Sequence, residues 1–98
     1  MAYKLVWSAE AETDFRNIVL YLKENWSVQS AEKFVKQTNL KLEKLSEMPT
    51  VARPTLQQSV YMYKLDHKNV VFLTIEENHL VILSIYPYRK DITKSKYF

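Results

Sequence analysis

The residues with the clearest capacity for chemistry lie at the C-terminal end of the chain. Residues 89–98 contain four basic side chains and one acidic side chain, Asp91, so they account for the whole formal net charge of +3. Such a local excess attracts an anionic partner, either a phosphate backbone or an acidic protein segment. Arg53 lies beside a proline, and it either joins this binding surface or pairs with a helix carboxylate. The candidate binding residues are therefore Arg53, Arg89, Lys90, Lys94 and Lys96.

Two residue types are missing from the sequence, and their absence excludes several kinds of chemistry. The chain has no cysteine, which excludes a thiol nucleophile, a disulfide scaffold and a cysteine-ligated metal. It also has no glycine, the residue that lets a backbone loop approach a phosphate closely. His67 and His79 have no matching carboxylate spacing. We therefore expect no metal site and no small-molecule cofactor.

The first half of the chain predicts a strand followed by two amphipathic helices. The strand is expected at residues 3–7, and Ser8 and Ser27 are suited to cap the two helices, because a serine hydroxyl accepts a hydrogen bond from an unpaired backbone N–H. Trp26 ends the apolar stripe of the first helix, which predicts a packed position in the core or at the helix junction. Pro49 ends the second helix. The short junction predicts an antiparallel helical hairpin.

The second half of the chain predicts three strands after a loop over residues 49–58. The strands are expected at 60–65, 70–75 and 80–86, and the last two are nearly unbroken apolar runs. Such runs indicate strands that are covered on both faces or central in the sheet. The hairpin covers one face, and the other is concave, covered by a partner or closed by the tail. We predict a single α+β domain over residues 1–98, with the order β-α-α-β-β-β and the hairpin packed on an antiparallel sheet.

These elements, in this order, resemble the RelE/ParE toxin superfamily, the toxins of type II toxin–antitoxin modules, in particular proteins described as plasmid stabilisation proteins. The resemblance covers essentially the whole chain. One departure is Ala52, where the family often has glycine before the arginine of the link between helix and strand. The matching motifs are Val6-Trp7-Ser8 with Glu10-Ala11, Ile18 with Tyr21-Leu22, Trp26-Ser27 with Ala31 and Phe34, Lys41-Leu42 with Leu45, Pro49 and Arg53, and Ile82-Leu83 with Ile85-Tyr86, Arg89 and Asp91.

The resemblance implies a cognate antitoxin and one of two targets. ParE-like toxins bind DNA gyrase without catalysis, whereas RelE-like toxins cleave mRNA on the ribosome without a metal. That cleavage uses the 2′-hydroxyl as nucleophile and requires a base, an acid and a cation for the phosphorane charge. We favour a ParE-like inhibitor of bacterial growth that binds gyrase. The alternatives are a ribosome-dependent mRNA endoribonuclease and a degenerate toxin that binds only its antitoxin.

The residues at the nuclease positions decide this preference. By resemblance, Arg89 matches a phosphate-binding arginine and Tyr88 a catalytic tyrosine. Asn69 replaces the other phosphate-binding arginine, and Pro87 replaces a histidine. Because an amide cannot stabilise growing negative charge as a guanidinium does, such a loss costs about 10²-fold or more in rate. A nearby lysine would have to compensate. If the protein is a nuclease, its catalytic residues are Arg89, Tyr88 and Lys64.

The N-terminal sequence bears on where the protein is found. Lys4, Glu10 and Glu12 interrupt the N-terminal segment, so it does not have the pattern of a signal peptide. The longest apolar runs are far below the roughly 20 residues that a membrane helix needs. We therefore expect a cytoplasmic protein without a membrane partner.

Overall fold

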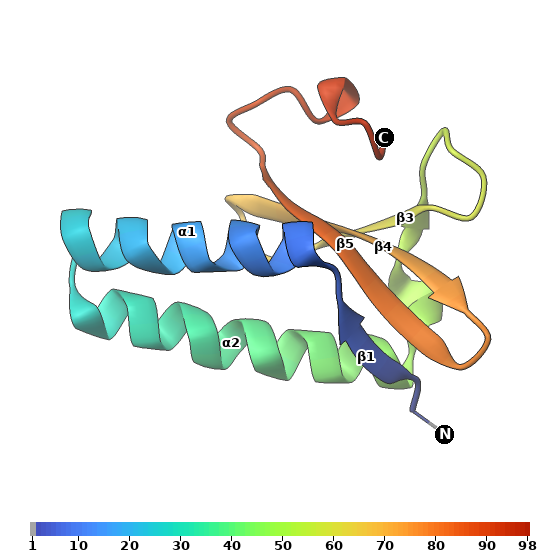
Figure 1. The fold of residues 1–98 in the computed structure, drawn as a ribbon, viewed down its shortest axis with the longest axis horizontal. Coiled ribbons are helices and arrows are strands. Elements are labelled where there is room, and N and C mark those ends of the chain that lie inside the picture. The colour runs from blue at the N-terminus through green and yellow to red at the C-terminus, as the bar shows by residue number, and fades with distance from the viewer. Residues whose placement is uncertain (1) are drawn as a thin grey trace.

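The computed structural model describes residues 2–98 and has the expected α+β fold, with a helical hairpin packed on a sheet (Figure 1). The strands form one five-stranded sheet in the order β1-β5-β4-β3-β2. The elements are β1 (Lys4–Trp7), α1 (Ala9–Asn25), α2 (Val28–Glu47), the 3-10 helix η1 (Pro49–Val51), β2 (Arg53–Pro54), β3 (Tyr61–Lys64), β4 (Asn69–Glu76), β5 (His79–Pro87) and the 3-10 helix η2 (Ile92–Lys94).

The sheet corrects two details of the sequence prediction. β1 pairs with β5 in parallel, with Trp7 opposite Ile82, so the sheet is mixed rather than wholly antiparallel. No tight turn joins these two strands, so turn geometry does not impose an antiparallel pairing on them. The loop expected over residues 49–58 also contains the two-residue strand β2, in which Arg53 lies opposite Met62 of β3.

Both predicted helix caps are present. The hydroxyl of Ser8 accepts from the backbone N–H of Ala11, and that of Ser27 accepts from the N–H of Ser30, each at 3.0 Å. Trp26 lies at the junction between the helices, as predicted, but its side chain is 66% exposed rather than packed. Trp26 is the residue that caps the end of α1, and the tip of the hairpin extends beyond the sheet (Figure 1).

Ser8 also fastens the first helix to the sheet. Its hydroxyl donates to the carbonyl oxygen of Leu83 at 2.9 Å, and its backbone N–H donates to that of Ile82 at 2.9 Å. Leu83 is the extra residue of a β-bulge, because the register between β4 and β5 shifts at this point. A single serine thus joins the end of β1, the start of α1 and the bulge in β5.

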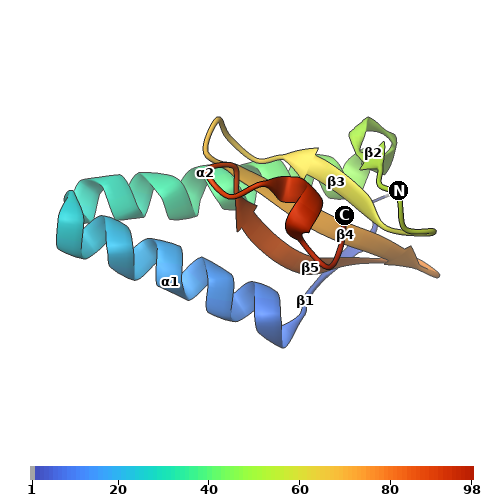
Figure 2. The same cartoon turned by 90° about the horizontal axis from the view of Figure 1, so that it is seen from above.

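The two faces of the sheet are covered by different parts of the chain. The helices cover one face and enclose the core, while the C-terminal tail crosses in front of β4 and β5 on the other face (Figure 2). On that second face, Phe72 is fully buried, and its ring lies 6.0 Å from that of Tyr97 and 6.3 Å from that of Tyr86. Of the three possibilities left open by the sequence, closure by the tail is therefore the one found. The core on the helix side contains Ala11, Leu42, Leu45, Leu65, Val71, Leu73, Leu80, Ile82 and Ile85.

Candidate functional site

The strands carry two of the candidate basic residues on the tail side of the sheet. Arg53 lies opposite Met62, which lies opposite Phe72, and directly paired residues point their side chains to the same face. Because Phe72 contacts Tyr97 of the tail, Arg53 points to the tail side. Lys64 lies two residues after Met62 in β3, so it points to the same side.

The tail is fastened to the first turn of α1. The ammonium of Lys96 lies 2.9 Å from Oε1 of Glu10, and the hydroxyl of Tyr97 donates to the same oxygen at 2.8 Å. Partial burial raises the pKa of Glu10, but the hydrogen bonds from Lys96 and Tyr97 and the lysine charge outweigh it, so the pKa lies below its ordinary value. The hydrogen bond to Glu10 in turn raises the pKa of Lys96. Lys96 therefore has a partner within the chain.

The tail also contacts the loop between β2 and β3. The backbone N–H of Leu56 donates to the carbonyl oxygen of Phe98 at 2.7 Å, and the side-chain amide of Gln57 donates to the carbonyl of Lys96. Lys96 is thus held by both Glu10 and Gln57, and Phe98 is held by Leu56. We call this set of contacts, made by Glu10, Leu56 and Gln57 with residues 96–98, the tail latch.

The remaining basic residues are exposed. Asp91, the acidic residue among them, caps η2: its carboxylate accepts from the backbone N–H of Thr93 at 3.0 Å and from the Thr93 hydroxyl at 2.6 Å. The Thr93 hydroxyl and then its N–H lower the pKa of Asp91. Within residues 2–98, the pair of Lys96 and Glu10 is the only ion pair. Four candidate residues thus remain exposed and free of a carboxylate: Arg53, Arg89, Lys90 and Lys94.

Two positions that matter for the nuclease alternative face each other across the sheet. Asn69 lies directly opposite Pro87. Asn69 is 8% exposed, and its side-chain amide donates to Oδ1 of Asp66 at 3.3 Å. The same oxygen accepts from the backbone N–H groups of Lys68 and Asn69, each at 2.8 Å. Asn69 therefore shapes the β3–β4 turn, and neither it nor Pro87 carries a charge or a titratable proton.

The remaining nuclease candidates lie at this end of the sheet. Tyr88 follows β5, and its backbone N–H donates to the carbonyl oxygen of Lys68 at 2.8 Å. Arg89 follows it and is exposed, and Lys64 ends β3 and is also exposed. Among the hydrogen bonds of residues 2–98, none joins Lys64 to Tyr88 or to Arg89.

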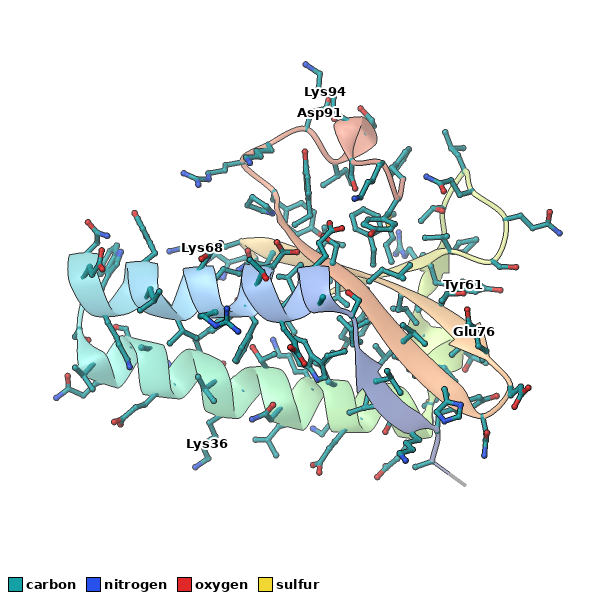
Figure 3. All side chains as sticks on the ribbon, viewed as in Figure 1. Lys36, Tyr61, Lys68, Glu76, Asp91 and Lys94 are labelled. Atoms are coloured by element: carbon teal, nitrogen blue, oxygen red, sulfur yellow. The ribbon has the colours of Figure 1, made fainter. Side chains whose placement is uncertain are left out.

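An exposed aromatic residue next to this end of the sheet was not identified from the sequence as functional. The ammonium of Lys68 lies over the ring of Trp26, 5.4 Å from its centroid. In Figure 3, Lys68 projects beside α1. The signal in the sequence was the position of Trp26 directly before the capping Ser27, because a residue there lies beyond the last turn of the first helix.

Two further findings concern metals and membranes. The described part of the chain contains no group of three or more His, Asp or Glu side chains placed to hold a metal ion. His67 lies in the β3–β4 turn, and His79 begins β5. No helix within residues 2–98 has the length and apolar character needed to cross a membrane.

Comparison with solved structures defines the class of protein to which this fold belongs. The chromosomal ParDE toxin–antitoxin system from P. aeruginosa contains a chain that matches with a TM-score of 0.78 at 18% identity, covering 88% of this chain and 96% of that one. The RelBE2 toxin–antitoxin complex from Mycobacterium tuberculosis gives a TM-score of 0.62 at 14% identity, covering 89% and 99%. The YoeB dimer from Staphylococcus aureus gives a TM-score of 0.60 at 19% identity, covering 86% of this chain and 94% of that one. The fold is thus that of the RelE/ParE toxin superfamily.

The sequence identifies the family within this class. Residues 5–92 match the family described as the ParE toxin of the type II toxin–antitoxin system parDE, and the chain belongs to that family. No curated protein sequence matches it at a significant level.

Proposed function

We propose that this protein is a ParE-like toxin that inhibits bacterial growth by binding DNA gyrase, and that a cognate antitoxin neutralises it. The observation that carries the choice of target is the facing pair of Asn69 and Pro87. By resemblance, RNA cleavage would use a cationic arginine at the first position and a titratable histidine at the second, and this chain has an uncharged amide and a proline there. A binding mechanism does not require these groups, whereas cleavage does.

The comparisons support the same branch of the superfamily. The matching family is described as the ParE toxin, and the TM-score with the ParDE structure is 0.78, against 0.60 with the YoeB dimer. The exposed, unpaired cations on the tail side of the sheet support a partner of opposite charge, because complementary charge speeds association and selects the partner. We propose that an acidic stretch of the antitoxin covers Arg53, Arg89, Lys90 and Lys94.

A supercoiling assay with purified gyrase, relaxed plasmid and ATP tests the target. We expect the purified toxin to inhibit supercoiling, and addition of the antitoxin encoded beside it to restore the activity. We also expect Arg89→Ala to abolish toxicity in cells at an equal level of expression, because this exposed guanidinium lies among the unpaired cations.

Primer extension on a defined mRNA in a purified translation system tests the alternative. New 5′ ends that appear only during translation, with supercoiling unaffected, would overturn the gyrase proposal in favour of the endoribonuclease. In that event Lys64 becomes the first candidate for the missing cation. Activity in neither assay, with antitoxin binding intact, would identify a degenerate toxin.

A further inference from the structure

Two exposed aromatic residues lie near Lys68 of the β3–β4 turn, whose side chain reaches the tip of the helical hairpin. Trp26 is 66% exposed and Tyr88 is 37% exposed. Lys68 connects them, because its ammonium lies over the Trp26 ring and its carbonyl oxygen accepts from the N–H of Tyr88. Large aromatic side chains of this kind are enriched in the centres of protein interfaces.

Lys68 lies over the Trp26 ring, and Arg89 and Lys90 directly follow Tyr88 in the sequence. Lys68, Arg89 and Lys90 are all exposed, and none of them has a carboxylate partner within residues 2–98. The carboxylate of this turn, Asp66, already accepts three hydrogen bonds from Lys68 and Asn69. It is therefore committed to the turn and does not neutralise the surface. We call Trp26, Lys68, Tyr88, Arg89 and Lys90 the tip patch.

We infer that the tip patch is the docking surface for the toxin's target, and that its occupant is an acidic protein segment with an apolar side chain that packs on Trp26. This inference rests on the proposed function, in which the toxin acts by binding rather than by cleavage. It locates the contact at the helix junction, the β3–β4 turn and the first residues of the tail.

The chemistry of the patch favours a protein segment over a nucleic acid strand. Proteins that bind single strands combine a charged groove that follows the backbone with aromatic rings on which successive bases stack. Here the cations are few and gathered at one end, and one face of the Trp26 ring already holds the Lys68 ammonium. Exposed Tyr21 and Val28 add apolar surface to the hairpin tip, which also carries the exposed side chains of Lys23 and Glu24. Exposed apolar rings beside cations suit a partner that supplies one apolar anchor and a few carboxylates.

Toxicity in cells provides a test of the patch that does not depend on the identity of the target. We expect Trp26→Ala and Lys68→Glu to raise colony counts after induction by at least about tenfold relative to the wild type, since truncating a central contact weakens binding by about that factor. Lys36→Glu is the matched control, because it makes the same charge change on exposed α2 surface far from Lys68 (Figure 3). It should remain fully toxic, and Lys68→Arg should retain toxicity because it keeps the charge.

The outcomes separate the patch from the choice of target. Full toxicity of both Trp26→Ala and Lys68→Glu, at equal expression, would overturn the inference. If Trp26→Ala fails to fold, as judged by thermal denaturation, the comparison of colony counts between Lys68→Glu and Lys36→Glu tests the inference. A wild-type toxin that kills cells without inhibiting supercoiling removes gyrase as the target, while the colony counts still decide whether the patch is used.

Two further measurements identify the occupant. A toxin variant that carries a photo-crosslinking phenylalanine analogue in place of Trp26 is mixed with purified gyrase. We expect it to crosslink to an acidic segment of gyrase, and a crosslink to a basic segment would overturn the assignment. Fluorescence anisotropy with a labelled single-stranded RNA oligonucleotide should show no binding that depends on Trp26. Micromolar binding that Trp26→Ala removes would assign the patch to nucleic acid and contradict the inference.

Discussion

The Ser8 side chain makes one more hydrogen bond than its role as a helix cap predicts. The sequence predicts a cap because a serine precedes an acidic, amphipathic stretch, and the structure confirms it. The bond from its hydroxyl to Leu83 could not be predicted, because the bulge that presents this carbonyl depends on the register of β4 against β5. Local patterns specify local hydrogen bonds, whereas contacts 75 residues apart in sequence depend on the assembled sheet.

Substituting the two capping serines separates these roles. We expect Ser27→Ala to lower the free energy of unfolding by about 1 kcal/mol, the usual cost of losing a cap. Ser8→Ala should cost about 2 kcal/mol, because it also leaves the Leu83 carbonyl without its donor. Chemical denaturation at neutral pH measures both values. Equal costs would mean that the bond to Leu83 contributes nothing to stability.

The turn between β4 and β5 contains one of the two residues with positive φ in the described part of this glycine-free chain; the other is Ser59. Glu77 has φ of 55°, in the left-handed region where glycine and asparagine are favoured. Relieving this cost should more than offset the extra flexibility that glycine gives the unfolded chain, so Glu77→Gly should raise the Tm by roughly 4 °C, which corresponds to a gain of under about 1 kcal/mol. Glu76→Gly, in the adjacent strand position, should lower the Tm. The sequence predicts the turn but not its positive φ, since the residue there is not glycine.

Asn69 and Trp26 mark the limits of prediction for single residues. The resemblance identified Asn69 as a position where the nucleases carry an arginine. The structure adds that its side-chain amide is buried and donates a hydrogen bond to the carboxylate of Asp66. Trp26 follows the apolar stripe of α1 in sequence, but it lies past the last helical turn and beyond the sheet. Periodicity predicts which way a side chain points only while the helix continues and something lies beneath it.

Among the elements, the tail is the one that changes the interpretation of the sequence most. Its charge predicted a binding segment, and the structure shows that residues 96–98 also cover Phe72 through the tail latch. The tail latch could not be predicted, because Glu10 lies 86 positions before Lys96 and no local sequence pattern relates two residues so far apart. The helices, their caps and the strands β3, β4 and β5 could be predicted from local sequence patterns, whereas the parallel pairing of β1 and the strand β2 could not.

The tail latch gives a pH dependence whose direction can be stated. The pKa of Glu10 is lowered in the folded chain, so its contribution is present above its ordinary pKa of 4.5 and is lost as pH falls through the lower folded value. The pKa of Lys96 is raised, so its contribution is present below 10.5 and is lost as pH rises through the higher folded value. The latch should therefore hold between these limits and open in acid.

Hydrogen exchange can measure this opening. The protection factor of the Leu56 N–H, which donates to the carbonyl of Phe98, should fall as pH drops below 4.5. In Glu10→Gln the same protection should be low at neutral pH and change little with acid. Protection of the Ser8 N–H, which donates to the carbonyl oxygen of Ile82, serves as the control, since this bond involves no residue of the tail. A Leu56 amide equally protected at all these pH values would contradict the latch.

At the scale of the whole molecule, the net positive charge comes from one part of the chain, the C-terminal tail. The helical half, residues 1–48, has equal numbers of basic and acidic side chains, so the net charge comes from the rest of the chain. The sequence predicted this separation along the chain. The fold adds Arg53 and Lys64 to the same side of the sheet, because β2 and β3 present them on the face that Phe72 shares.

This arrangement predicts that antitoxin binding depends on salt and on the position of each charge. Deleting residues 89–98 is a poor test, because it also removes Tyr97 from Phe72 and Lys96 from Glu10. The double variant Lys90→Glu and Lys94→Glu leaves the latch in place and reverses two exposed charges. We expect it to weaken antitoxin binding by at least about tenfold at low salt, and by less as salt screens the surface.

The double variant Lys33→Glu and Lys36→Glu is the control, because it makes the same charge change on α2 and should bind the antitoxin normally. Isothermal titration calorimetry at two salt concentrations compares the two, and equal losses of affinity would show that overall net charge, rather than the tail side of the sheet, governs the interaction.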